Sequence, residues 1–209
     1  MVSVVTSANR ERYRTELDTM FRDRKSIFID FLKWRDLEII DGVYEKDAYD
    51  TERSVYLISA DPETHMHLCS MRLMPTTEPH LLRDVFPELC DGDIPIGEDV
   101  WEVTRLCTSP KLKGEAGRNA RRHLSIAMVE FALLYELTRL TMISHMEYLS
   151  RLLAVGWECR PLGLPKERDG QLFGAMEVSI TPATLRAIRM QFGGNRRTPV
   201  LELEGLAAA

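Results

Sequence analysis

The sequence predicts a mixed α/β fold in which one sheet carries helices on both faces. Two observations support this class and its arrangement in one domain. Segments with apolar residues at helical spacing alternate along the chain with short apolar runs bounded by turn residues. The chain also has 209 residues, enough to bury a sizeable core in one domain. We therefore expect one domain over residues 1–195 and a frayed tail over 196–209.

The first half of the chain is predicted to hold one helical region and a pair of strands. Apolar residues recur at helical spacing over about residues 9–33. Residues 34–50 are polar and rich in Asp, so we expect a long loop, and loops of this length are usually functional. The elements that follow are expected to be strands at 54–60 and 65–74 and a short helix at 80–89.

The second half is predicted to begin with a strand at residues 100–108, which leads through a basic turn into the longest helix, at about 118–139. Thr181 and Pro182 are typical of the start of a last helix, because they supply a cap residue followed by proline at the first helical position. The elements expected between these helices are a strand at 140–144, a helix at 147–155 and extended segments at 157–161 and 174–180.

Composition and charge exclude several classes of protein. The 32 acidic and 27 basic residues give a net charge of −5, whereas nucleic-acid-binding proteins are usually basic. No apolar run approaches the ~20 residues of a membrane span, and the first residues lack the apolar core of a signal peptide. The four cysteines lie far apart in the sequence, which is typical of reduced thiols. We expect a cytoplasmic protein with no membrane span and no nucleic-acid partner.

A short motif of possible metal ligands lies in the second predicted strand. His65, His67 and Cys69 would share one face of that strand, because side chains alternate with period 2. No paired Cys or His elsewhere supplies a fourth ligand for zinc. A half-exposed hairpin strand is therefore the favoured interpretation, and no metal is expected.

A basic, glycine-containing segment separates the 100–108 strand from the long helix. Backbone N–H groups at such a helix start can bind a phosphate, and a basic first turn is unusual where acids are normally found. We expect an anionic partner here, with a solvated basic turn as the alternative. The basic residues are Lys111, Lys113, Arg118, Arg121 and Arg122.

Short motifs along the chain are more informative together than singly. An isolated Asp-x-x-Asp is common in turns, and a Glu near an Arg on a strand is common as a surface pair. In order, however, the motifs resemble the acyl-homoserine-lactone synthase family, the autoinducer synthases of bacterial quorum sensing. They are Arg24-x-x-x-Phe28 with Trp34, Asp47-x-x-Asp50, Arg72-Leu73-x-Pro75-Thr76, Val85-Phe86-Pro87 and Trp101-Glu102-x-Thr104-Arg105.

The resemblance covers about residues 20–110, with looser similarity to about 180. It implies an acetyltransferase-like (GNAT) fold and a two-step reaction. A fatty acyl group passes from acyl-CoA or an acyl carrier protein to the α-amine of S-adenosylmethionine. The methionine carboxylate then attacks its own γ-carbon, which closes the lactone and releases 5′-methylthioadenosine. S-adenosylmethionine is a cosubstrate, so no cofactor is expected. The alternatives are another N-acyltransferase of this fold or a non-catalytic module that binds acyl groups or a carrier protein.

The resemblance also implies roles for individual residues. Glu102 is the candidate base that deprotonates the amine, and Arg105 is a second catalytic candidate that suits the carboxylate of S-adenosylmethionine, with anchoring of the Asp loop as the alternative. On a flat strand these two side chains point to opposite faces, so we expect a bulge in this strand. The basic turn is expected to dock the donor. The residues expected to contact S-adenosylmethionine are Arg24, Phe28, Trp34, Asp47, Asp50, Arg72 and Phe86. Those expected to line the acyl pocket are Thr104, Thr141, Met142 and Ile143.

Overall fold

The computed structural model describes residues 1–34, 37–153, 155–192 and 201–202. The chain forms two units, and the expectation of one domain over 1–195 stays a prediction. The first unit comprises Met1–Arg72, Arg105–Ala127 and Pro199–Ala209, and the second comprises Leu73–Thr104 and Met128–Thr198. Three elements run from one unit into the other: β5 (His67–Pro75), β6 (Val100–Thr108) and α3 (Gly114–Leu134).

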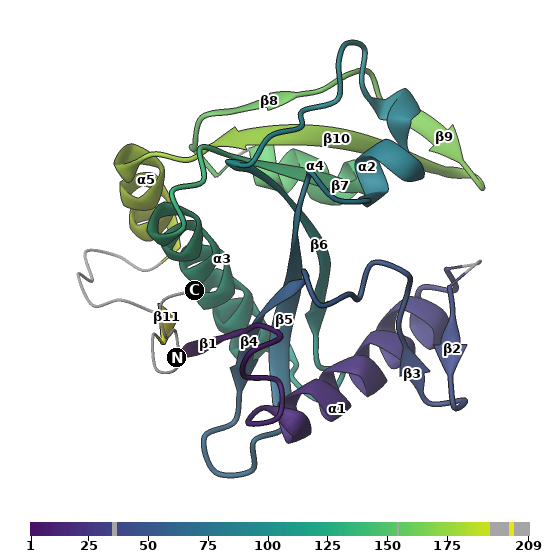
Figure 1. The fold of residues 1–209 in the computed structure, drawn as a ribbon, viewed down its shortest axis with the longest axis vertical. Helices are drawn as coiled ribbons and strands as arrows, with labels where there is room; N and C mark the ends of the chain where they lie inside the picture. Colours follow the sequence, from purple (N-terminus) through teal and green to yellow (C-terminus); the bar gives the residue numbers. More distant parts are fainter. Residues whose placement is uncertain (35–36, 154, 193–200, 203–209) are drawn as a thin grey trace. The chain divides into compact units, whose positions relative to one another are not determined.

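The first unit combines a sheet with a long helical segment. Strand β1 pairs antiparallel with β4, with Ser3 opposite Ile58, and parallel with β11, with Val2 opposite Leu201. In Figure 1, α1 runs alongside the small hairpin formed by β2 and β3. The elements that lie wholly in this unit are β1 (Val2–Val5), α1 (Arg14–Arg24), the π-helix η1 (Lys25–Phe31), β2 (Ile39–Ile40), β3 (Tyr44–Glu45), β4 (Val55–Ala60) and β11 (Leu201–Glu202).

The core of the first unit lies between α1 and the sheet. Met20 and Phe21 on α1 pack with Val5, Tyr56 and Ile58 from the strands, and all five are buried. The rings of Phe21 and Tyr56 meet edge to face, with centroids 5.9 Å apart. This contact fixes the end of α1, where the helix continues directly into η1.

The second unit is also a mixed sheet with helices. Strand β6 pairs parallel with β7, and β7 pairs antiparallel with β10, which in turn pairs antiparallel with β8 and β9. Both units therefore contain parallel and antiparallel pairs, as the predicted mixed class requires. The elements that lie wholly in this unit are α2 (Leu81–Asp84), the 3₁₀-helix η2 (Pro87–Leu89), β7 (Arg139–His145), α4 (Met146–Leu153), β8 (Cys159–Pro161), β9 (Lys166–Arg168), β10 (Gln171–Ser179) and α5 (Pro182–Phe192).

Several boundaries differ from those expected from the sequence. The strand expected at 100–108 is β6, but the long helix begins at Gly114 and ends at Leu134 instead of spanning 118–139. It ends early because Glu136 has a φ of 55°, which allows Leu137 to bond back to the carbonyl of Ala132. The second hairpin strand starts at His67 instead of residue 65, because His65 is also left-handed, with a φ of 57°.

The helix expected at 80–89 is divided into α2 and the 3₁₀-helix η2, and short strands account for further differences. The expected loop over 34–50 contains the β2–β3 hairpin, and strands β1 and β9 were not expected. Within the tail expected to be frayed, 196–209, Leu201 and Glu202 form β11, and the rest of that tail lies outside the described residues. Across the described parts of the chain, none of the helices is long and apolar enough to cross a membrane.

The start of α3 depends on a glycine. A Cβ added at Gly117 would lie 2.8 Å from the carbonyl oxygen of Leu112, in the turn that precedes the helix. We expect Gly117→Ala to lower the free energy of unfolding by about 1–3 kcal/mol through this clash, although alanine favours helices. Gly92→Ala is the control, because no atom lies within 4 Å of its added Cβ. Urea unfolding of both variants checks the prediction, which fails if Gly117→Ala is as stable as the wild type.

Candidate active site

Six charged side chains of the first unit pair in alternating order to form a closed ring, called the ion-pair ring below. Arg24, at the end of α1, donates from Nε to Glu45 at 2.5 Å. Its two terminal nitrogens donate to the two oxygens of Asp50, each at 2.9 Å. In order around the ring, the members are Arg24, Glu45, Arg105, Asp47, Arg72 and Asp50.

The other half of the ring is held by the two strand arginines. Arg72 on β5 contacts Asp50 at 2.9 Å and both oxygens of Asp47, at 2.5 and 3.0 Å. Arg105 on β6 contacts Asp47 at 2.6 Å and Glu45 at 3.0 Å. The ring therefore joins α1, β3, the following loop, β5 and β6 through side chains alone.

The members of the ring are nearly all buried. Asp47 has 13% of its side chain exposed, and the other five have between 0 and 7%. Three positive and three negative groups cancel, so no net charge is buried. Asp50 also accepts hydrogen bonds from the Tyr56 hydroxyl at 2.8 Å and from the Asp47 backbone N–H at 2.9 Å. Asp50 is thus surrounded by partners within the protein, whereas Asp47 reaches the surface.

The surroundings of Asp50 set its protonation. Burial alone would raise the pKa of this carboxyl, but the charges of Arg24 and Arg72 and the hydrogen bonds that it accepts outweigh burial. The pKa therefore lies well below its ordinary value of 3.8. Asp50 stays ionised throughout the range in which proteins normally work.

The strand β6 is distorted where it meets the ring. Arg105 has a φ of 52°, in the left-handed region that a non-glycine residue in a strand seldom adopts. The regular alternation of side chains is broken at this residue. A left-handed residue departs from a flat strand, and the bulge that we expected between Glu102 and Arg105 stays a prediction.

Two aromatic side chains lie beside the ion-pair ring. Phe28 and Trp34 stack with centroids 4.8 Å apart and planes inclined by 7°. The Arg105 guanidinium lies 5.7 Å from the centre of the Phe28 ring. Phe28 belongs to the π-helix η1, and the backbone N–H of Trp34 donates to the Phe28 carbonyl at 2.9 Å. π-helical turns occur frequently at functional sites.

Glu102 belongs to the second unit and is fully buried. Its two carboxylate oxygens accept hydrogen bonds from the backbone N–H groups of Leu81, at 2.9 Å, and Leu82, at 2.7 Å. On the neighbouring strand β7, Thr141 lies directly opposite Glu102, so the two side chains share a face of the sheet. The Thr141 hydroxyl is buried and has no hydrogen-bond partner among the described residues.

The structure divides the residues expected to line the acyl pocket. Thr141 and Ile143 point to one face of β7, and Met142 points to the other, because strand side chains alternate. Thr104, two residues after Glu102 in β6, is half-buried. Phe86, expected to contact S-adenosylmethionine, belongs to the second unit and packs on Phe173 at 5.7 Å.

The basic residues near α3 differ in their partners. Arg118 and Arg122 both pair with Glu115, at 2.6 and 3.5 Å, and Arg121 donates to Thr108. The expectation of a basic first turn is wrong, because the helix begins at Gly114 and its first turn contains Glu115. Lys111 and Lys113 precede the helix, and neither forms an ion pair within the described part of the chain.

The His65, His67 and Cys69 motif does not form a metal site. His65 is exposed and its Nδ1 lies 2.9 Å from Glu16, whereas Cys69 is buried against Thr108. Within the described residues, no group of His, Cys, Asp or Glu side chains could hold a metal ion.

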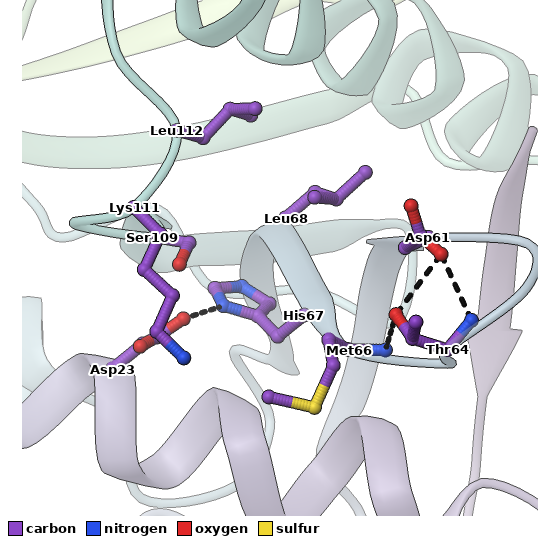
Figure 2. Close-up of a pocket in the computed structure, with 9 residues that line it drawn as sticks. All are labelled: Asp23, Asp61, Thr64, Met66, His67, Leu68, Ser109, Lys111 and Leu112. Carbon is purple, nitrogen blue, oxygen red and sulfur yellow. Dashed lines mark hydrogen bonds and ion pairs between the residues drawn. The ribbon is translucent and has the colours of Figure 1, made fainter.

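His67 instead lines a pocket of about 240 Å³ in the first unit. Figure 2 shows His67 paired with Asp23, with Lys111 on the same side of the pocket. The His67 Nδ1 lies 2.8 Å from Asp23, and its Nε2 lies 2.9 Å from the Ser70 hydroxyl. Both ring nitrogens are therefore occupied, and His67 connects α1 to β5.

Glu45 is the ring member that the sequence analysis missed. It is fully buried and bridges Arg24 and Arg105. No spacing pattern in the sequence indicates Glu45, because its strand has only two residues, Tyr44 and Glu45. Charge balance was the available signal, since three arginines with only two aspartates leave one buried cation unpaired.

Comparisons with known proteins identify the class. A family model described as autoinducer synthase matches residues 8–183. The isovaleryl-homoserine lactone synthase of Bradyrhizobium diazoefficiens is 30% identical over 198 residues, which cover 92% of this chain and 86% of that protein. The chain belongs to the autoinducer synthase family, whose members are acyltransferases.

Solved structures agree with this assignment. A CoA-dependent acyl-homoserine lactone synthase, BjaI, with SAM and isopentyl-CoA, superposes with a TM-score of 0.86 at 28% identity, over 97% of this chain and 92% of that one. An N-acetyltransferase structure from Lactobacillus plantarum has a TM-score of 0.56 at 18% identity, over 86% of this chain and 99% of that one. The second likeness bears on the fold alone. The expected acetyltransferase-like fold is confirmed.

The low pKa of Asp50 predicts how acid destabilises the fold. A carboxyl whose pKa is lowered by folding stabilises fully above its ordinary pKa of 3.8, and this contribution is lost as the pH falls below that value. We expect Asp50→Asn to cost about 3–5 kcal/mol at neutral pH, because it leaves buried arginines underpaired. We also expect its stability to depend less on pH in the acid range than that of the wild type.

Urea unfolding across the acid-to-neutral range measures both effects. Asp93→Asn is the matched control, because Asp93 is exposed and should leave stability and its pH dependence unchanged. If Asp50→Asn retained the acid dependence of the wild type, Asp50 would not be a main source of that dependence.

Proposed function

We propose that this protein is an acyl-homoserine-lactone synthase that uses an acyl-CoA donor. In the first step, the amine of S-adenosylmethionine attacks the thioester carbonyl, an amide bond forms, and the CoA thiol leaves. In the second step, an oxygen of the methionine carboxylate attacks the γ-carbon. The carbon–sulfur bond breaks, the lactone closes, and 5′-methylthioadenosine leaves as a neutral thioether. S-adenosylmethionine is consumed, and the reaction requires no cofactor.

The ion-pair ring is the observation that carries this proposal. S-adenosylmethionine has a sulfonium, an ammonium and a carboxylate, so its site needs carboxylates and an arginine held at fixed positions. Asp47 is the ring carboxylate best placed to meet a cation, because it is the most exposed member, whereas Asp50 is surrounded by protein partners. We assign Asp47 to the cosubstrate and Asp50 to holding the ring together.

The aromatic pair supplies a second part of the cosubstrate site. Phe28 and Trp34 present stacked rings next to Arg105. A sulfonium over an aromatic face is favoured by roughly 1 kcal/mol, and adenine stacks on such rings as well. We assign this pair to the sulfonium and adenine end of S-adenosylmethionine.

Glu102 is assigned to the proton transfer. Each of its oxygens accepts one backbone N–H, which fixes the carboxylate in position, and a carboxylate oxygen can take up the proton of the amine. The two backbone bonds hold the carboxylate against the start of α2. Such a base typically accelerates a reaction ~10²–10⁴-fold.

The donor is assigned to CoA on the basis of the basic turn and the relatives. Lys111 and Lys113 form no ion pairs within the described residues and so remain available for the CoA phosphates, whereas Arg118 and Arg122 share Glu115. The similar structure, BjaI, is CoA-dependent. We place the reaction in the cytoplasm, a reducing compartment that suits the four free cysteines of the chain.

The proposal is tested by supplying purified protein with S-adenosylmethionine and panels of acyl-CoA and acyl carrier protein donors. We expect release of 5′-methylthioadenosine that depends on an acyl-CoA, with one lactone formed for each molecule released. Chromatography and mass spectrometry measure both products. Acylated S-adenosylmethionine accumulating without lactone would refute the second step. No turnover with either donor class would favour a binding module, and turnover with carrier protein alone would refute the CoA assignment.

The role of Glu102 is tested with Glu102→Gln. The glutamine amide cannot accept the backbone N–H that one carboxylate oxygen accepts, so we expect some loss of stability as well as of the base. The kcat for each folded molecule should fall by ~10²–10⁴-fold while the Kd for S-adenosylmethionine changes little. Glu98→Gln, at an exposed position four residues earlier, is the control. A folded Glu102→Gln enzyme with near-wild-type kcat would rule out the base.

A further inference from the structure

An apolar cluster covers the face of the second unit's sheet on which Glu102 lies. Its buried centre is formed by Leu82 and Leu89, from the α2–η2 segment, together with Ala175 on β10. Ile143 and Leu162 pack against this centre and are only partly buried. The cluster therefore includes one residue already expected to line the acyl pocket, and it continues beyond that residue.

Strand pairing defines a path from Glu102 into this cluster. Thr141 on β7 lies opposite Glu102, and Ile143 is the next residue of β7 on the same face. Ile143 lies opposite Ala175 on β10. The Ala175 carbonyl accepts the backbone N–H of Leu162 at 2.9 Å. The path crosses three strand spacings, roughly 14 Å, and ends at Leu162.

Leu162 belongs to a short segment, Leu162–Leu164, that we call the strap; it joins β8 to β9, both labelled in Figure 1. The Leu162 carbonyl accepts the Asp91 N–H at 3.0 Å, and the Leu164 N–H donates to the Asp91 carboxylate at 3.2 Å. A Cβ added at Gly163 would lie 2.6 Å from the Leu89 carbonyl oxygen, so glycine alone allows this close approach. Backbone bonds thus hold Leu162 from both β10 and the segment after η2.

We propose that Leu162 is a specificity-determining residue, which ends the acyl-chain site and limits the length of chain that the enzyme accepts. This inference rests on the proposed function. A chain whose thioester lies beside Glu102 follows the apolar face past Ile143 and Ala175 and meets Leu162. Because both backbone groups of Leu162 are bonded to different neighbours, its backbone is held in place, and its side chain packs against the cluster at the end of the path.

The strap contains its own control residue. Leu164 has the same side chain two positions later, but 68% of it is exposed. Leu162→Ala opens the end of the path, whereas Leu164→Ala removes the same atoms without opening it. Leu162→Phe adds volume at the same place and should act in the opposite direction.

The experiment offers each enzyme an equimolar mixture of acyl-CoA donors of increasing chain length and measures the lactones by mass spectrometry. For Leu162→Ala, we expect the ratio of longer to shorter products to rise roughly tenfold, the effect of about two more buried methylene groups. Leu162→Phe should shift the products to shorter chains, and Leu164→Ala should match the wild type. Melting curves confirm that each variant is folded.

Two results would overturn the inference, and they differ in what else they refute. An active wild type whose product lengths are unchanged in both Leu162 variants would remove Leu162 from the acyl site and leave the proposed function intact. A wild type that makes no lactone from any donor would refute the proposed function, and the inference with it.

Discussion

The first unit depends on the ion-pair ring. Burying a lone charge costs several kcal/mol, and each member of the ring offsets much of that cost through its two neighbours. The ring therefore stabilises as a whole, and it draws together segments as distant in sequence as Arg24 and Arg105. An enzyme that binds a substrate with three charged groups needs opposing charges fixed in advance, so that no reorganisation is required during reaction. The interactions that fold this unit also prearrange its charges.

Glu102 is held by a different kind of interaction. The ring uses side chains to fix side chains, whereas Glu102 is fixed by the backbone of Leu81 and Leu82. A buried arginine lowers the pKa of a carboxyl that it contacts, so the carboxylate becomes a weaker base. Backbone N–H groups fix the position of a carboxylate without adding a full positive charge beside it. The two arrangements suit the two tasks that we assign, binding of a cation and acceptance of a proton.

The sequence was most informative where a local pattern determines the structure. Strand β6 was predicted at its observed bounds, because nine residues of strand-like composition end at a proline turn. Two- and three-residue strands such as β3, β9 and β11 have no period to detect. The order of motifs identified five of the six ring members but not their pairing, because the pairing depends on contacts across the fold. Glu45 was missed for this reason. The sequence also did not show that Asp50 would be surrounded by partners within the protein.

The π-helix η1 separates Arg24 from the stacked rings of Phe28 and Trp34 by a wider turn than an α-helix allows. A π-helical turn is equivalent to an α-helical turn with one residue inserted. Deleting one residue between Lys25 and Phe28 would restore ordinary α-helical phase and rotate Phe28 by about 100° relative to Arg24. The helix would become more regular while the aromatic pair turned away from Arg105. A one-residue insertion or deletion here would change the direction in which the aromatic side chains point, and not the stability of the helix.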